Sequence, residues 1–132
     1  MIEMYCDGAS RGNPGKASIG VSILKNGKEV YTISRALGLS TNNVAEWNAL
    51  LAGLQECIRM GEREVCVFLD SELVVKQYSG EYKTKHKDLI PLKEKVKALV
   101  PSFENIQIRH IRRENNKRAD ELANMALDRI ES

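Results

Sequence analysis

The chain has few of the residues that build small metal- or disulfide-stapled proteins. Its 132 residues include only three cysteines and two histidines. Cys6, Cys57 and Cys66 contain no Cys-x-x-Cys pair. An odd number of scattered cysteines argues against a disulfide framework and against a zinc ribbon. It favours a reducing compartment, which we expect to be the cytoplasm.

Long apolar runs are also missing. No run approaches the ~20 residues that a membrane-spanning helix needs. Residues 1–5 show neither the basic nor the apolar region of a secretory signal. We therefore expect no membrane partner. With 42% hydrophobic and 29% charged residues, the composition is that of a globular protein, and the length predicts a single domain over residues 1–132.

The chain has little net charge, but its charge is unevenly distributed. Residues 1–82 carry eight basic and ten acidic side chains, whereas residues 83–132 carry twelve basic and eight acidic ones. Basic clusters suit a polyanionic partner, although such runs are often only a solvated surface. The two clusters are Lys83, Lys85 and Lys87, and then Arg109, Arg112, Arg113, Lys117 and Arg118.

Hydrophobic periodicity predicts the element order β-β-β-α-β-α-α-β-α. Asn26-Gly27 between two alternating runs predicts a hairpin turn. The order implies an α/β protein of mixed α+β type, whose mixed sheet carries helices on its faces. Strands are predicted at 2–6, 17–24, 29–37, 65–69 and 106–108, and helices at 44–60, from a Ser71 cap through 78, at 87–100, and from 115 or 116 onward.

Two of the predicted strands run into an aspartate, Asp7 and Asp70. If these strands are adjacent and parallel, both carboxylates leave the same edge of the sheet, where ligands bind in open α/β folds. Glu46 and Asp120 lie in the first turns of two predicted helices. Each acid alone is also typical of a turn or of a helix N-terminus.

The four acids together would make an unusual site. Four converging carboxylates would repel one another unless cations were bound between them. Hard oxygen ligands suit magnesium or manganese. Two such ions ~4 Å apart activate a water and stabilise the leaving oxygen in phosphodiester cleavage.

The motifs around these acids resemble the type 1 ribonuclease H family in order and spacing over nearly the whole chain. The resemblance implies a ribonuclease H-like fold, with a five-stranded mixed sheet whose first three strands are antiparallel. It implies an endonuclease that cuts the RNA strand of RNA–DNA hybrids and leaves 5′-phosphate and 3′-hydroxyl ends. Asp7, Glu46, Asp70 and Asp120 would be catalytic and would hold two Mg²⁺ or Mn²⁺ ions. The motifs are the run at 7–15, Thr41-Asn42-Asn43-x-x-Glu46, Asp70-Ser71 and Ala119-Asp120-x-Leu122-Ala123.

The resemblance also implies substrate contacts. Asn13, Asn42 and Asn43 match positions that contact the minor groove and its 2′-hydroxyls, and Thr41 matches one that holds a DNA-strand phosphate. Amide side chains both donate and accept hydrogen bonds, as a 2′-hydroxyl does, and this group distinguishes RNA from DNA. The predicted substrate-binding residues are Gly8, Ser10, Asn13, Thr41, Asn42, Asn43, Ser71, Lys83, Lys85, Arg113 and Asn116.

The chain departs from the family pattern in several places. The segment from Tyr78 to Leu89 is too short for the long basic handle that many members carry, so we expect weaker hybrid binding. His110 has the spacing of a mobile catalytic histidine, but its pattern places it on the last strand. We therefore keep His110 only as an auxiliary candidate beside Arg113. His86 stands where an asparagine that contacts the DNA strand is common, and Glu72 where a neutral amide is common.

Three other functions fit the same residues. One is a non-catalytic module of the same fold that binds hybrids or double-stranded RNA. The second is a related nuclease of the same fold that acts on DNA junctions or as a recombinase. The third is a structural protein that binds no nucleic acid. For the enzyme we expect a monomer whose partner is an RNA–DNA hybrid, with double-stranded RNA as an open second substrate.

Overall fold

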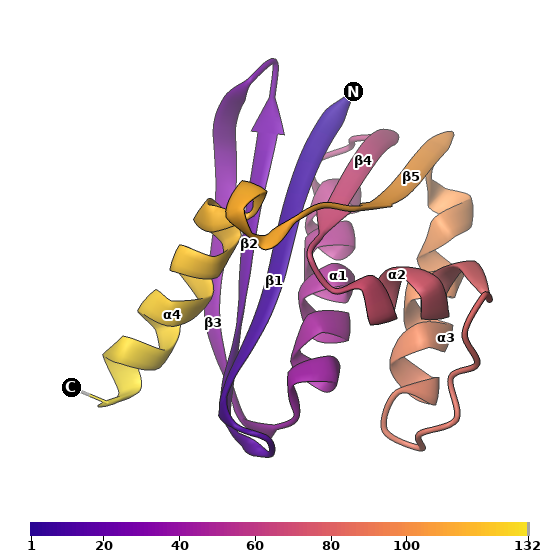
Figure 1. The fold of residues 1–132 in the computed structure, drawn as a ribbon. Helices are drawn as coiled ribbons and strands as arrows, with labels where there is room; N and C mark the ends of the chain where they lie inside the picture. Colours follow the sequence, from indigo (N-terminus) through magenta and orange to yellow (C-terminus); the bar gives the residue numbers. More distant parts are fainter. Residues whose placement is uncertain (132) are drawn as a thin grey trace.

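The computed structural model describes residues 1–131, which form a five-stranded sheet with helices on both faces (Figure 1). The strand order is β3-β2-β1-β4-β5. The strands are β1 (Ile2–Gly12), β2 (Gly15–Lys25), β3 (Lys28–Ser40), β4 (Glu64–Leu69) and β5 (Asn105–His110). The helices are α1 (Asn42–Arg59), α2 (Glu72–Ser79), α3 (Ile90–Leu99) and α4 (Lys117–Glu131), with single 3-10 turns at Val100–Ser102 and Arg113–Asn115.

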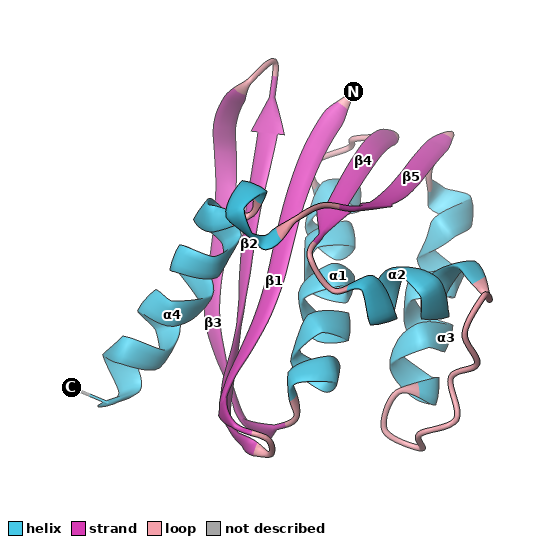
Figure 2. Ribbon diagram, in the orientation of Figure 1, coloured by secondary structure: helices cyan, strands magenta, loops and turns pink. Residues whose placement is uncertain are grey.

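The predicted element order and the mixed sheet are both confirmed (Figure 2). Strands β1, β2 and β3 pair in antiparallel fashion, whereas β4 pairs in parallel with both β1 and β5. The hairpin turn lies at Asn26 and Gly27, whose φ angles of 54° and 77° are the left-handed values that a two-residue turn of this kind requires.

Side-chain caps fix the first residues of helices α1 and α2. The Thr41 hydroxyl accepts a hydrogen bond from the Val44 amide at the start of α1, at 3.2 Å. The Ser71 hydroxyl accepts from the Val74 amide at the start of α2, also at 3.2 Å. These caps satisfy backbone donors that have no partner within the helix, so both helices start directly beside the sheet edge.

The first strand is longer than predicted. It was expected to end before Asp7, but β1 continues to Gly12 because β2 pairs with it along that whole stretch, as far as the Gly12–Gly15 pair. What does end at Cys6 is the pairing with β4, whose last partner there is Leu69. The predicted break is therefore a change of neighbours and not the end of a strand.

The third helix is shorter than predicted, since it begins at Ile90 and not at residue 87. Pro91 lies in its first turn, where a missing amide proton costs nothing. Residues 80–89, which connect α2 to α3, contain no helix. The basic handle is therefore absent, as expected.

The core lies mainly between the sheet and α1, where Trp47, Leu50 and Leu54 are fully buried. Helix α4 packs on the opposite face, and Gly20 permits this because a Cβ there would overlap the backbone of Ala119 and Ala123. All three cysteines are buried and free. Among the described residues, no helix combines the length and the apolar character needed to cross a membrane.

Candidate active site

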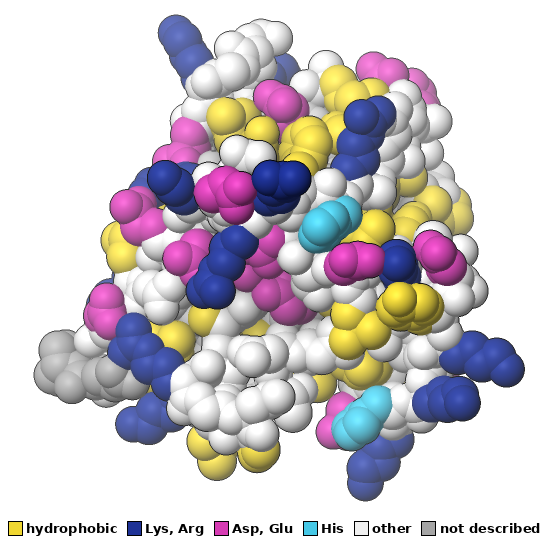
Figure 3. Space-filling model, in the orientation of Figure 1, with side chains coloured by type: hydrophobic (Ala, Val, Ile, Leu, Met, Phe, Trp, Pro, Cys, Tyr) yellow, Lys and Arg dark blue, Asp and Glu magenta, His cyan; other side chains and the backbone are white. Residues whose placement is uncertain are grey.

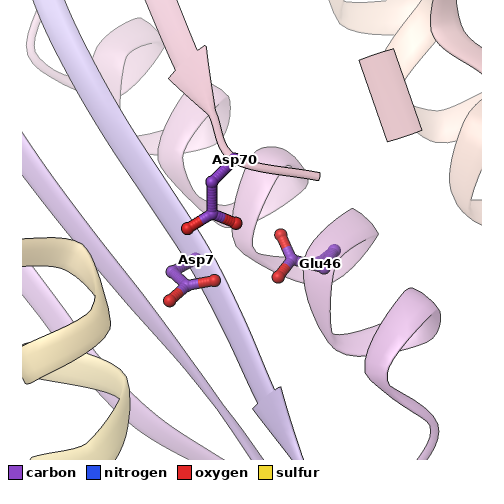
Figure 4. Close-up of side chains that lie close together, drawn as sticks. All are labelled: Asp7, Glu46 and Asp70. Carbon is purple, nitrogen blue, oxygen red and sulfur yellow. The ribbon is translucent and has the colours of Figure 1, made fainter. Parts of the chain in front are cut away.

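Three of the four predicted acids meet beside the point where β4 ends. Asp7 follows Cys6 on β1 and Asp70 follows Leu69 on β4, so the last parallel pair of these strands places the two carboxylates side by side. Glu46 reaches them from the first turns of α1. One ligand oxygen from each residue lies within 4.8 Å of the others, and the three side chains point toward one another (Figure 4).

Gly8 allows α1 to come close enough for this meeting. A Cβ at position 8 would overlap backbone atoms of Ala45 and Glu46. Glycine is the residue that permits such a close approach of two backbones. Gly8 was predicted to contact substrate, and the structure gives it this packing role at the floor of the site.

The three carboxylates form an electrostatically unfavourable group when no cation is present. Asp7 is 5% exposed and Glu46 is 8% exposed. Burial raises the pKa of Asp7 from its usual 3.8 to about 7, and the carboxylates of Asp70 and Asp120 add to the rise. Burial and then the Asp7 carboxylate raise the pKa of Glu46 well above its ordinary value.

The donor set of this group fits a hard divalent cation. It offers carboxylate oxygens, with no cysteine or histidine in the group. The Oε2 atom of Glu46 is buried and has no hydrogen-bond partner. A buried carboxylate oxygen without a partner is costly. Because bound magnesium or manganese would satisfy it, the site could hold a metal.

Asp120, the fourth predicted acid, belongs to the same cleft but not to the group of three. It comes from the first turn of α4, and the amide of Asn124 donates to its Oδ1 at 3.2 Å. Its carboxylate is close enough to raise the pKa of Asp7. Its role as a metal ligand therefore remains a prediction.

The acids lie in a cleft of about 540 Å³. Figure 3 shows acidic side chains gathered in a hollow near the centre of this face, with basic side chains around it. Many of the residues predicted to contact substrate line this cleft: Gly8, Ser10, Asn42, Asn43, Ser71 and Arg113. Arg11, Leu73 and Asn124 also line it and were not predicted. The spacing of Asn124, one helical turn after Asp120, could have indicated it.

Two of the three predicted minor-groove residues, Asn13 and Asn42, are linked by a hydrogen bond. The Asn13 side chain, on the β1–β2 hairpin, accepts a hydrogen bond from the Asn42 amide at 3.2 Å. The Ser10 hydroxyl donates to the carbonyl of Ser40 at 3.1 Å and also contacts that of Gly12. These contacts hold the hairpin against the start of α1.

A second cleft of about 350 Å³ adjoins the first. Thr41 and Asn43 lie on one side of it, and the basic connector contributes Lys83, Lys85 and His86. The structure thus brings the predicted phosphate residue Thr41 together with two of the lysines that follow α2. His86 lies in this cleft as well, at the place where the family often has an asparagine.

Three predicted residues, Asn13, Asn116 and His110, are not among the described residues that line either cleft. Asn116 was expected to contact substrate, but its side chain is 1% exposed and therefore cannot reach one. Its Nδ2 donates to the Cys6 carbonyl at 2.8 Å and to Asp70 Oδ2 at 3.2 Å. His110 is an exposed residue at the end of β5 and is not among the described residues that line the cleft.

Comparisons with known proteins agree with this architecture. A family model described as "Reverse transcriptase-like" matches residues 5–126. A ribonuclease H of Pseudomonas entomophila is 32% identical over an alignment of 146 positions, gaps included, which covers 98% of this chain and 95% of that protein. The crystal structure of LC11-RNase H1 in complex with an RNA/DNA hybrid has a TM-score of 0.93 and 41% identity, with both chains covered completely.

Other relatives are longer than this chain. A bifunctional protein of Mycobacterium tuberculosis is 42% identical over 129 residues, which are 96% of this chain and 35% of that protein. The chain thus spans about a third of the length of this protein and of two similar mycobacterial relatives. The ribonuclease H of Pseudomonas entomophila and LC11-RNase H1 each align with this chain nearly from end to end. Together with the placement of the acids, these matches show that the chain belongs to the type 1 ribonuclease H family, in a short form without the basic handle.

Proposed function

We propose that the protein is a metal-dependent endoribonuclease that cuts the RNA strand of RNA–DNA hybrids and leaves 5′-phosphate and 3′-hydroxyl ends. The observation that carries this proposal is the meeting of Asp7, Glu46 and Asp70 at the floor of a cleft. A pure binding module gains nothing from buried carboxylates that face phosphates. The hybrid bound to the related LC11-RNase H1 supports the choice of substrate.

The acids would hold two Mg²⁺ or Mn²⁺ ions, with Asp7, Glu46 and Asp70 as ligands and Asp120 completing the set. When bound, such ions supply activation of a water and neutralisation of charge on the departing 3′-oxygen. The protein's own contribution is to hold the carboxylates in place before substrate arrives. All four acids come from one chain, so we propose that the monomer is sufficient.

The residues around the acids would orient the hybrid. Asn13, Asn42 and Asn43 offer amide donors and acceptors, which match the 2′-hydroxyl of the RNA strand. Arg113 lines the cleft, and its positive charge would attract the scissile phosphate. In the second cleft, Thr41, Lys83 and Lys85 would hold a phosphate of the DNA strand.

A substrate panel tests the proposal. The purified protein is incubated with end-labelled RNA–DNA hybrid, duplex RNA or duplex DNA, with Mg²⁺ or Mn²⁺. We expect cleavage of the RNA strand of the hybrid and none of duplex DNA. Retention of the hybrid without cleavage under either metal would instead indicate a non-catalytic binding module. Cleavage of duplex RNA would extend the substrate range.

The lysines of the second cleft should govern binding and not chemistry. The double variant Lys83→Ala/Lys85→Ala is expected to raise KM for the hybrid about tenfold with little change in kcat. Removal of a lysine that binds a phosphate also lowers the slope of log affinity against log salt by about 1. Affinity is measured by fluorescence anisotropy over a range of salt concentrations.

The matched control removes the same charge elsewhere. Lys28 and Lys95 are exposed lysines, and neither lines either cleft. Lys28→Ala/Lys95→Ala should leave the salt slope close to that of the wild type. Equal slopes for the two double variants would contradict a specific phosphate contact at Lys83 and Lys85.

A further inference from the structure

Two asparagines flank Asp120 on α4 at intervals of one helical turn. Asn116 directly precedes the helix and Asn124 lies in its second turn, so both are four residues from Asp120 and share its side of the helix. Each donates a hydrogen bond from its side-chain amide to a carboxylate of the cleft: Asn116 to Asp70, and Asn124 to Asp120.

The Asn116 amide connects three separate segments. Its two protons are both used, one on the Cys6 carbonyl at 2.8 Å and one on Asp70 Oδ2 at 3.2 Å. The side chain is 1% exposed, and its own Oδ1 has no hydrogen-bond partner. A buried amide that leaves its acceptor unpaired is costly. The surroundings of Asn116 therefore satisfy its amide donor group, which bonds to Asp70, and not its amide oxygen.

The Asn124 amide acts in the same way one turn beyond Asp120. It donates to the Asp120 carbonyl at 2.9 Å and to Asp120 Oδ1 at 3.2 Å. Bonding to the carbonyl four residues earlier is common for polar helix residues, and Asn48 does the same toward Val44 at 2.9 Å. The second bond, to the carboxylate, distinguishes Asn124 from Asn48.

Neutral amides suit this task better than cations would. A lysine or arginine at either position would orient the carboxylate but would also neutralise its charge. An amide fixes the rotamer through a hydrogen bond and leaves the full negative charge available to a metal. Hydrogen bonds to ligating carboxylates are a usual part of metal sites, and their removal costs roughly 10–100-fold in metal affinity or activity.

We propose that Asn116 and Asn124 are positioning residues that hold the carboxylates of Asp70 and Asp120 ready for divalent cations. This inference rests on the proposed function for its catalytic consequence. The orientation of the two carboxylates by the two amides, in contrast, affects metal binding by the protein even without substrate. Neither residue touches substrate in this role: Asn116 is buried, and Asn124 acts through Asp120.

The test compares Asn116→Ala, Asn124→Ala and the control Asn48→Ala. Mn²⁺ alone is titrated into each protein by calorimetry without nucleic acid, and kcat and KM are then measured with the hybrid. We expect Asn116→Ala and Asn124→Ala to weaken Mn²⁺ binding about tenfold and to lower kcat by a similar factor, with KM for the hybrid unchanged. Asn48→Ala should stay within about twofold of the wild type in both measurements.

Several outcomes would overturn the inference. One such outcome is an Mn²⁺ affinity equal to that of the wild type in both Asn116→Ala and Asn124→Ala. Another is an equally weakened affinity in Asn48→Ala, because loss of the hydrogen bond to the carbonyl four residues earlier would then explain the effect. Because Asn124 is only partly buried, its variant keeps the test decisive if Asn116→Ala fails to fold. Failure of the wild type to cut a hybrid refutes the proposed function alone, because the Mn²⁺ titration uses no nucleic acid.

Discussion

Asp70→Asn is expected to lower kcat for hybrid cleavage at least about a thousandfold. The substitution keeps the shape of the side chain but removes the charge of one of the three converging carboxylates. A metal-bound water and a neutralised leaving oxygen are worth several kcal/mol of transition-state stabilisation, and about 4 kcal/mol corresponds to a thousandfold in rate. The rate is measured with labelled hybrid at saturating Mg²⁺ and again with Mn²⁺.

Binding of the hybrid should survive the same substitution. Asp70 faces the expected position of a phosphate, so removal of its charge also removes a repulsion when no metal is bound. We expect anisotropy to give an affinity equal to that of the wild type or higher. Glu104→Gln is a suitable control, because this acid is 67% exposed and pairs with Arg63 on the surface. Cleavage by Asp70→Asn at the wild-type rate would refute the metal-dependent mechanism.

The sequence predicted the edge of the sheet at which the site lies. Apolar runs that lead into Asp7 and Asp70 indicated that both carboxylates leave the same edge if their strands pair in parallel. The parallel pairing of β1 with β4 up to Cys6 and Leu69 confirms that placement, although β1 itself continues to Gly12. The element order and the cap at Ser71 also followed from local chemistry. Such features depend on near neighbours in the chain, and they are therefore visible without the fold.

Features that depend on distant neighbours were not predictable in this way. The extension of β1 to Gly12 is set by β2, and the packing role of Gly8 is set by α1. Asn116 was expected at the substrate surface. Its burial follows from the path of residues 111–116 past the end of β4, where the Ile111 amide donates to the Leu69 carbonyl at 2.9 Å, to Cys6 of β1, whose carbonyl accepts from Asn116.

A second large effect is expected on stability in the absence of metal. Asp7→Asn should raise the free energy of unfolding by about 3 kcal/mol at pH 8, because it removes a buried charge beside Glu46 and Asp70. The pKa of Asp7 rises from 3.8 to about 7 on folding. At 1.36 kcal/mol per pKa unit, this rise sets an upper limit of about 4 kcal/mol on the contribution of Asp7.

The sign of the pH dependence follows from proton binding. Between pH 3.8 and about 7 the folded protein retains a proton on Asp7 that the unfolded chain has lost. Stability of the metal-free wild type therefore falls as the pH rises through this window and levels off above it. Asparagine resembles the protonated acid at every pH. The gain from Asp7→Asn should thus be close to zero near pH 4 and complete by pH 8.

Urea unfolding in the presence of EDTA at several pH values measures this difference, with Glu104→Gln again as the exposed control. Equal stability of Asp7→Asn and the wild type at pH 8 would contradict an unfavourable acidic cluster. Addition of Mn²⁺ should reverse the order, since a ligand that binds only the folded state stabilises it, and the wild type binds the ion better. A residue that lowers the stability of the free protein and raises that of the metal-bound protein is retained for its site and not for the fold.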